Sequence, residues 1–152
     1  MGSEMCIRDR SKGDYKLGGS SFAQVLNKIG SSAPDVCEAD YLKKCFDQIQ
    51  KLIVDNHIIA GHDISAGGMA TTLLELCFPS QNVGATIDLT ALGEDDTTKL
   101  LMAENAGIIF QSNNNNVATL LSEQGITCVK IGTATNKAVS YTHLTLPTIC
   151  SV

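Results

Sequence analysis

A short polar stretch, HDISAGG at residues 62–68, separates two apolar runs and carries residue types that could do chemistry. The first turn of a helix has free backbone N–H groups and a partial positive charge, so it suits a phosphate oxygen. Glycines there let an anion approach the backbone closely, and a carboxylate at a strand end can bind a Mg²⁺ ion that bridges phosphates. The pattern therefore makes Asp63 a candidate metal ligand and Ser65, Gly67 and Gly68 candidate nucleotide contacts.

The same stretch has a plainer interpretation. Asp63 or Ser65 could be only a helix N-cap, and the two glycines could only ease a tight turn. The spacing matches neither a Walker A loop nor the G-x-G-x-x-G fingerprint. From the residues alone, both interpretations stay open.

A second glycine-rich turn, LGGSS at residues 17–21, also leads into a helix-like segment. Alone it is a weak signal. Two such turns in one small domain favour a shared anionic ligand, because each presents backbone N–H groups at a helix start. We therefore add Gly18, Gly19 and Ser20 to the candidate nucleotide contacts.

The other ionisable residues look structural. His62 is expected to be a hydrogen-bonded packing histidine and His57 a helix C-terminal cap. Glu75 and Glu104 read as solvated helix residues. Because no Ser-His-Asp or Cys-His spacing is present, we predict no catalytic residue in this chain.

Composition limits the class of protein. The chain has 152 residues, 43% of them hydrophobic, and a net charge of −5, which suits one globular domain. The acidic balance argues against nucleic-acid and anionic-membrane partners, and no apolar run approaches the roughly 20 residues of a membrane span. The six cysteines form no CxxC pair, which favours reduced thiols and a cytoplasmic location.

Periodicity predicts the elements that position these residues. Helices are expected at 21–28, with Gly30 as the stop, and at 38–56, 68–78 and 96–104, with a last one that runs to Gln124 and has Gly125 as its stop. Strands are expected at 58–64, which looks buried, and at 83–89, 106–112 and 127–135. The fold class is α+β, a layered α/β sandwich in which helices face one sheet of about four strands.

The two ends look foreign to the domain. A nucleotide string that can encode MCIRDR at 5–10 has a reverse complement that encodes VSYTH, which stands at 139–143. Complementary ends of this kind resemble a sequencing-library adapter translated in both directions. We therefore expect 1–13 to be adapter and lead-in, 14–136 to be the domain, and 137–152 to be adapter. The other interpretation is that VSYTHLTLPT is a native β-rich strand.

Three stretches carry a resemblance to a known family: LGGSSFAQVLNKIG, GHDISAGGMATTLLELCF and LLMAENAGIIFQ. Together they resemble the C-terminal domain of the second synthetase half of phosphoribosylformylglycinamidine synthase, the large single-chain type, within the aminoimidazole ribonucleotide (AIR) synthetase-related superfamily. The resemblance implies an AIR synthase C-terminal-domain-like fold. It also implies that Asp63 contacts magnesium and that Ser65 contacts a nucleotide.

The resemblance implies an enzyme activity for the whole protein, an ATP-dependent C–N ligase. It joins formylglycinamide ribonucleotide and glutamine to give formylglycinamidine ribonucleotide in purine biosynthesis, with Mg²⁺ and ATP/ADP as cofactors. The expected partners are small-molecule substrates and two absent parts of the same chain, the N-terminal synthetase domain and the glutaminase domain. This fragment alone is therefore predicted to be inactive.

Two alternatives stay open beside that interpretation. The domain could come from a related enzyme, such as AIR synthetase or selenophosphate synthetase, in which case no glutaminase domain would follow in the gene. It could also be a structural nucleotide-binding module without turnover of its own.

Overall fold

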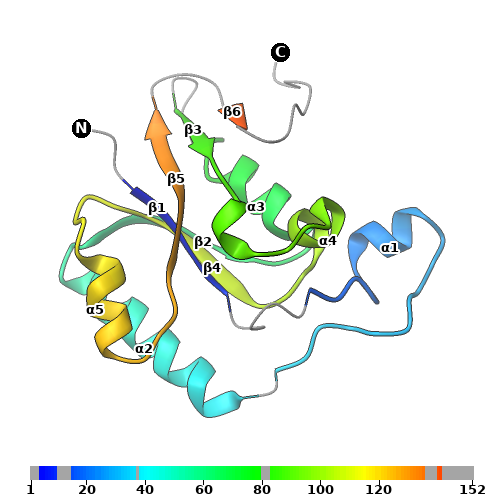
Figure 1. Ribbon diagram of the computed structural model, residues 1–152, viewed down its shortest axis with the longest axis horizontal. Helices are drawn as coiled ribbons and strands as arrows, with labels where there is room; N and C mark the ends of the chain where they lie inside the picture. Colours follow the sequence, from blue (N-terminus) through cyan, green and yellow to red (C-terminus); the bar gives the residue numbers. More distant parts are fainter. Residues whose placement is uncertain (1–3, 10–14, 37, 80–82, 136–139, 142–152) are drawn as a thin grey trace.

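The computed structural model describes residues 4–9, 15–36, 38–79, 83–135 and 140–141, and it has an α+β fold. One six-stranded sheet in the order β2-β4-β1-β5-β3-β6 is covered by helices on both faces (Figure 1). All neighbouring strands are antiparallel except β3 and β6. The strands are β1 Glu4–Asp9, β2 Ile58–Ile64, β3 Gly84–Ile87, β4 Gly107–Ser112, β5 Val129–Thr135 and β6 Ser140–Tyr141.

The helices form two layers. Helices α2 (Ala39–Val54) and α5 (Val117–Glu123) cover one face of the sheet, and α3 (Gly68–Glu75) and α4 (Thr97–Met102) cover the other (Figure 1). A short helix α1 (Ser21–Val25) and a 3₁₀ turn (Thr90–Leu92) complete the elements of the described residues.

Each face of the sheet has its own core, because strand side chains alternate between the faces. The core under α3 and α4 contains Met5, Met69, Leu73, Ala85, Ile87, Leu100, Ile109 and Ile131. The core under α2 and α5 contains Cys6, Cys45, Ile49, Leu52, Ile58, Phe110, Val117, Leu121 and Ile126.

The four expected strands are present, and the α+β prediction is confirmed. The prediction of a buried strand at 58–64 is wrong: β2 is an edge strand, and Ile59 is 52% exposed. Burial of a strand depends on how many neighbours flank it, and local apolarity does not report that number.

The sheet contains two strands that lie in the segments expected to be foreign. β1 pairs with both β4 and β5 in the middle of the sheet, and β6 pairs with β3. These pairings describe how the residues pack in this chain. The prediction that 1–13 and 137–152 are adapter-derived concerns the gene, so it stays a prediction.

Helix ends follow local turn chemistry. After α1, Asn27 adopts a positive φ of 55° and Lys28 N–H donates to Ala23 O at 2.8 Å, which closes a Schellman turn. The helix therefore stops earlier than expected, and Gly30 is not its stop. The expected stop at Gly125 is confirmed, because it has a φ of 65° and Ile126 N–H donates to Leu121 O at 2.9 Å.

The inward face of α2 is narrower than the face that helical spacing predicts from the sequence, which consists of Leu42, Cys45, Phe46, Ile49, Leu52 and Ile53. Cys45, Ile49 and Leu52 are buried, but Phe46 is 61% exposed and Ile53 43% exposed. The buried residues form the central i, i+4, i+7 stripe, Tyr41 packs against the same core while partly buried, and Phe46 and Ile53 on the flanks face outward.

The described cysteines are free thiols, as expected: Cys6, Cys45, Cys77 and Cys128. The other two, Cys37 and Cys150, lie outside the described residues. Among the helices that the structure describes, none combines the length and apolarity that crossing a membrane requires.

Candidate functional site

The junction between β2 and α3 presents two polar side chains to solvent. Asp63 lies near the end of β2 with its side chain 75% exposed, and Ser65 is exposed on the loop that follows. Gly67 and Gly68 then begin α3 with positive φ angles of 85° and 69°. The four site residues predicted in HDISAGG therefore lie together at one strand-to-helix turn.

The two glycines have a packing reason in addition to their φ angles. A Cβ at Gly68 would lie 2.5 Å from the carbonyl oxygen of Leu101, and one at Gly67 would overlap the side chain of Thr71. Glycine therefore lets the start of α3 approach the end of α4 backbone to backbone. This close approach brings the first N–H groups of α3 near the residues that follow α4.

Glu104 occupies the place where an anionic ligand was anticipated. Its Oε1 atom accepts the N–H of Ser21 at 2.7 Å and the N–H of Gly67 at 2.8 Å. The prediction of a solvated helix residue is wrong, because α4 ends at Met102 and Glu104 lies in the segment before β4. The two glycine-rich turns therefore do share one anion, and it is a side chain of the chain itself.

The environment of Glu104 changes its acidity. Burial raises the pKa of the carboxyl, but backbone hydrogen bonds from Gly67 and Ser21 and one from the Ser21 side chain lower it by more, so the pKa lies below the ordinary value of 4.5. The folded state therefore binds fewer protons than the unfolded state as the pH falls through this range. Glu104 contributes stability above pH 4.5, and that contribution is lost on acidification.

We expect the difference in free energy of unfolding between wild type and Glu104→Gln to be largest above pH 4.5 and to shrink as the pH falls through the folded-state pKa. Urea unfolding followed by circular dichroism from pH 3 to 7 measures it. The control is Glu123→Gln, which neutralises an exposed carboxylate on α5. A wild-type to Glu104→Gln difference that stays constant into acid would contradict the linkage.

The other predicted contacts lie in the LGGSS turn, whose backbone donors have partners within the chain. Gly18 N–H donates to Ser32 O at 2.8 Å, and Gly19 N–H donates to Ile29 O at 2.7 Å. The Ser20 hydroxyl caps α1 by accepting the N–H of Ala23 at 3.2 Å. The turn is thus a helix entry whose first free donor, Ser21 N–H, goes to Glu104.

His62 is hydrogen-bonded, as expected, and lies half-buried. Its Nδ1 lies 2.7 Å from the backbone oxygen of Asp63, and its Nε2 lies 3.2 Å from Oε2 of Glu75 on α3. His57 follows the C-terminus of α2, where its backbone N–H donates to Leu52 O at 2.9 Å, and its imidazole Nδ1 lies 3.1 Å from Nδ2 of Asn114. Both histidines therefore serve local structure.

The protein side chains at this junction suit a magnesium ion that is held mainly by the phosphates of a bound nucleotide. Among the residues that the structure describes, no group of three or more His, Cys, Asp or Glu side chains could enclose a metal. Asp63 is an exposed carboxylate at the junction. Mg²⁺ commonly keeps several waters and binds through one or two carboxylates plus phosphates, so Asp63 fits that role.

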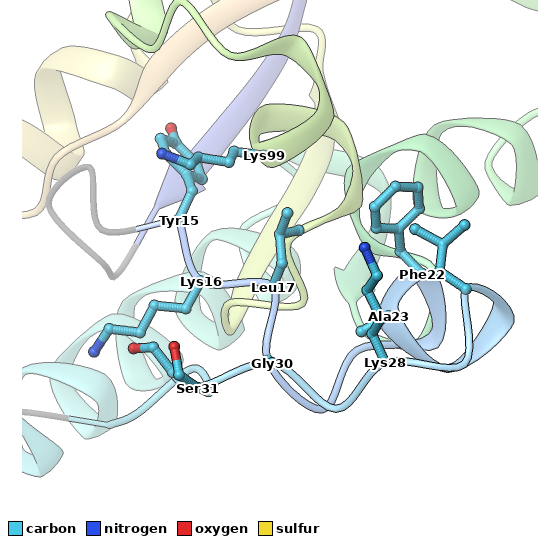
Figure 2. Close-up of a pocket in the computed structure, with 12 residues that line it drawn as sticks. Tyr15, Lys16, Leu17, Phe22, Ala23, Lys28, Gly30, Ser31 and Lys99 are labelled. Atoms are coloured by element: carbon cyan, nitrogen blue, oxygen red, sulfur yellow. The ribbon is translucent and has the colours of Figure 1, made fainter.

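A pocket of about 530 Å³ lies beside the LGGSS turn (Figure 2). Figure 2 shows that three lysines line it from separate segments: Lys16 before the turn, Lys28 after α1, and Lys99 on α4. Its walls include Leu17 and Phe22, and none of the described residues that line it carries a carboxylate. Sequence reasoning missed these lysines because they come from separate segments that line one pocket only in the folded chain.

Comparison with known proteins decides the family. The family described as AIR synthase related protein, C-terminal domain, matches residues 12–144. The chain belongs to this family. The predicted resemblance is thereby confirmed, and so is its AIR synthase C-terminal-domain-like fold.

Two related sequences are named as probable phosphoribosylformylglycinamidine synthases. The chain is 38% identical over 115 residues to the probable phosphoribosylformylglycinamidine synthase, chloroplastic/mitochondrial, of Arabidopsis thaliana, covering 76% of this chain and 8% of that protein. It is 37% identical over 135 residues to the probable phosphoribosylformylglycinamidine synthase of Caenorhabditis elegans, covering 82% of this chain and 10% of that protein. The chain is thus homologous to about one tenth of these enzymes.

Solved structures share the fold. T. maritima PurL complexed with FGAR matches with a TM-score of 0.66 at 17% identity, covering 93% of this chain and 26% of that one. T. maritima PurL complexed with ATP matches with a TM-score of 0.60 at 15% identity, covering 94% and 24%. A thiamine-monophosphate kinase from Stenotrophomonas maltophilia matches at 0.54 and 14%, covering 93% and 50%.

Proposed function

We propose that this domain contributes to a magnesium–nucleotide site in a phosphoribosylformylglycinamidine synthase. The observation that carries the proposal is the exposed pair of side chains, Asp63 and Ser65, at the turn where β2 meets α3. Homology to the plant and nematode enzymes supports the choice of enzyme. The solved complex of a PurL with ATP supports the choice of ligand.

The whole enzyme would form formylglycinamidine ribonucleotide from formylglycinamide ribonucleotide, glutamine and ATP. The bound magnesium would neutralise negative charge on the phosphates. In this chain Asp63 would hold that ion and Ser65 would donate its hydroxyl hydrogen to a phosphate oxygen. The N–H of Gly67 already donates to Glu104. A phosphate oxygen of the nucleotide would therefore be bound by the Ser65 side chain and not by the N–H of Gly67.

We expect Asp63→Asn in the full-length enzyme to weaken retention of the magnesium–nucleotide complex about tenfold or more, because a neutral amide is a poorer Mg²⁺ ligand than a carboxylate. Nucleotide and magnesium per protein, measured after purification and in a titration with Mg-ATP, give the result. The matched control is Asp95→Asn, which neutralises another exposed carboxylate. Unchanged nucleotide content in Asp63→Asn would refute the role.

The proposed partners follow from how little of the relatives this chain spans, 8% and 10% of their lengths. The N-terminal synthetase domain and the glutaminase domain would supply the remaining nucleotide ligands and the ammonia. The 152-residue chain alone would therefore have no turnover. A cytoplasmic location remains a prediction from composition.

One observation favours a second candidate, a structural nucleotide-binding module. Among the described residues, Asp63 belongs to no group of three or more His, Cys, Asp or Glu side chains that could hold a metal ion. A site of that kind could hold a nucleotide without turning it over. Loss of nucleotide in Asp63→Asn with full amidine formation by the whole enzyme would support this candidate.

A further inference from the structure

Glu104 connects two turns that are distant in the sequence. One of its oxygens, Oε1, accepts from Ser21 N–H at 2.7 Å and from Gly67 N–H at 2.8 Å. The next side chain does a similar task, because Oδ1 of the buried Asn105 accepts the N–H of Lys16 at 3.2 Å. Two consecutive side chains thus tie the first residue of α1 and the segment before it to the segment between α4 and β4.

The position of this carboxylate is fixed from both sides. α4 ends at Met102, and the backbone of Leu101–Met102 lies so close to Gly68 that a Cβ there would be 2.5 Å from the Leu101 oxygen. The start of α3 and the residues after α4 therefore hold one geometry. Each turn is held by a charge-assisted hydrogen bond, which is about twice as strong as a neutral one.

We propose that Glu104 is a positioning residue: its carboxylate holds the turn at residues 17–21 against the turn at residues 65–68 and so sets the geometry that a nucleotide meets at Ser65. The link between the turns stands on the hydrogen bonds alone. Its effect on nucleotide binding rests on the function proposed above.

The link has a direct test by amide hydrogen exchange on the full 152-residue chain. Glu104→Ala is expected to raise exchange at both Ser21 and Gly67 by about tenfold or more, the range for losing a hydrogen bond to a charged group. Glu104→Gln keeps an acceptor oxygen, so it should raise exchange less at both amides. The control, Glu123→Ala on α5, should change neither.

A second variant tests whether the two turns are coupled. Ser21 is the first residue of α1, where proline is well tolerated, and Ser20 has an extended backbone that suits a residue before proline. Ser21→Pro removes one of the two N–H donors to Glu104, so exchange at Gly67 should rise although that residue is untouched. Unchanged exchange at Gly67 in Ser21→Pro, or an effect of Glu104→Ala on one turn only, would overturn the link.

Mg-ATP titration of the full-length enzyme tests whether Glu104 affects nucleotide binding. Glu104→Ala should weaken binding about tenfold, Glu104→Gln should remain within about threefold of wild type, and Glu123→Ala should match wild type. Equal binding by Glu104→Ala would overturn the positioning role and leave the proposed function standing. Absence of Mg-ATP binding by wild type would overturn both the proposed function and the effect of Glu104 on nucleotide binding. The hydrogen-exchange results would still decide whether Glu104 links the two turns.

Discussion

Gly68→Ala is expected to lower the free energy of unfolding by about 2–5 kcal/mol. Two costs add. A non-glycine residue at a φ of +69° loses about 1–2 kcal/mol. The new Cβ would also meet the Leu101 oxygen at 2.5 Å and the Met102 Cα at 2.9 Å, and crowding of this kind costs about 1–3 kcal/mol. Both neighbours are backbone atoms, so neither can rotate away.

Gly93→Ala is the matched control. Gly93 has nearly the same φ, +70°, but a Cβ there would meet nothing within 4 Å. It should lose only the conformational part, about 1–2 kcal/mol. Urea denaturation of both variants, followed by far-UV circular dichroism, separates the two costs. Equal destabilisation would show that the close approach of α3 to α4 does not limit the substitution.

Phe110→Ala should be comparably severe, with a loss of about 3–5 kcal/mol. Phe110 lies on β4, which is flanked by β2 and β1, and is 0% exposed, packed in the core under α2 and α5. Removing its ring would take away buried apolar surface and leave a cavity that strands on both sides prevent from collapsing. Thermal and urea unfolding should both report the loss.

Phe46→Ala removes the same ring from a different environment. Phe46 is 61% exposed on the outer flank of the α2 stripe, so we expect a loss below about 1 kcal/mol. Both variants remove the same phenyl ring, so the difference between their losses of stability reports the effect of burial. Losses of similar size would mean that Phe46 is packed inward, as the helical periodicity alone predicts.

Much of this fold could be predicted from local patterns. Apolar runs located the four strands, and turn residues such as Gly125 located a helix end, because these signals depend on neighbours a few residues away. The edge position of β2 could not be predicted in this way. It depends on strand order, and a single sequence does not report which strands become neighbours.

The candidate site shows the same division. Asp63, Ser65 and the two glycines are close in sequence, so their shared turn could be read from spacing. Glu104 could not, since its hydrogen-bond partners lie 83 and 37 residues away along the chain. The sequence did suggest that both turns would face one anion, and only the folded chain shows that a side chain provides it.

The central place of β1 has a consequence for how the chain folds. Glu4 pairs with Ser112 of β4 and with Thr133 of β5. β1 therefore finds its partner strands only in the last third of this chain. Contacts between residues so distant in sequence form only after long loops have closed. Closing a loop costs conformational entropy before the new contacts stabilise the chain, which slows folding. During synthesis the early helices would emerge with their apolar faces uncovered, since the middle of the sheet completes only when β5 arrives.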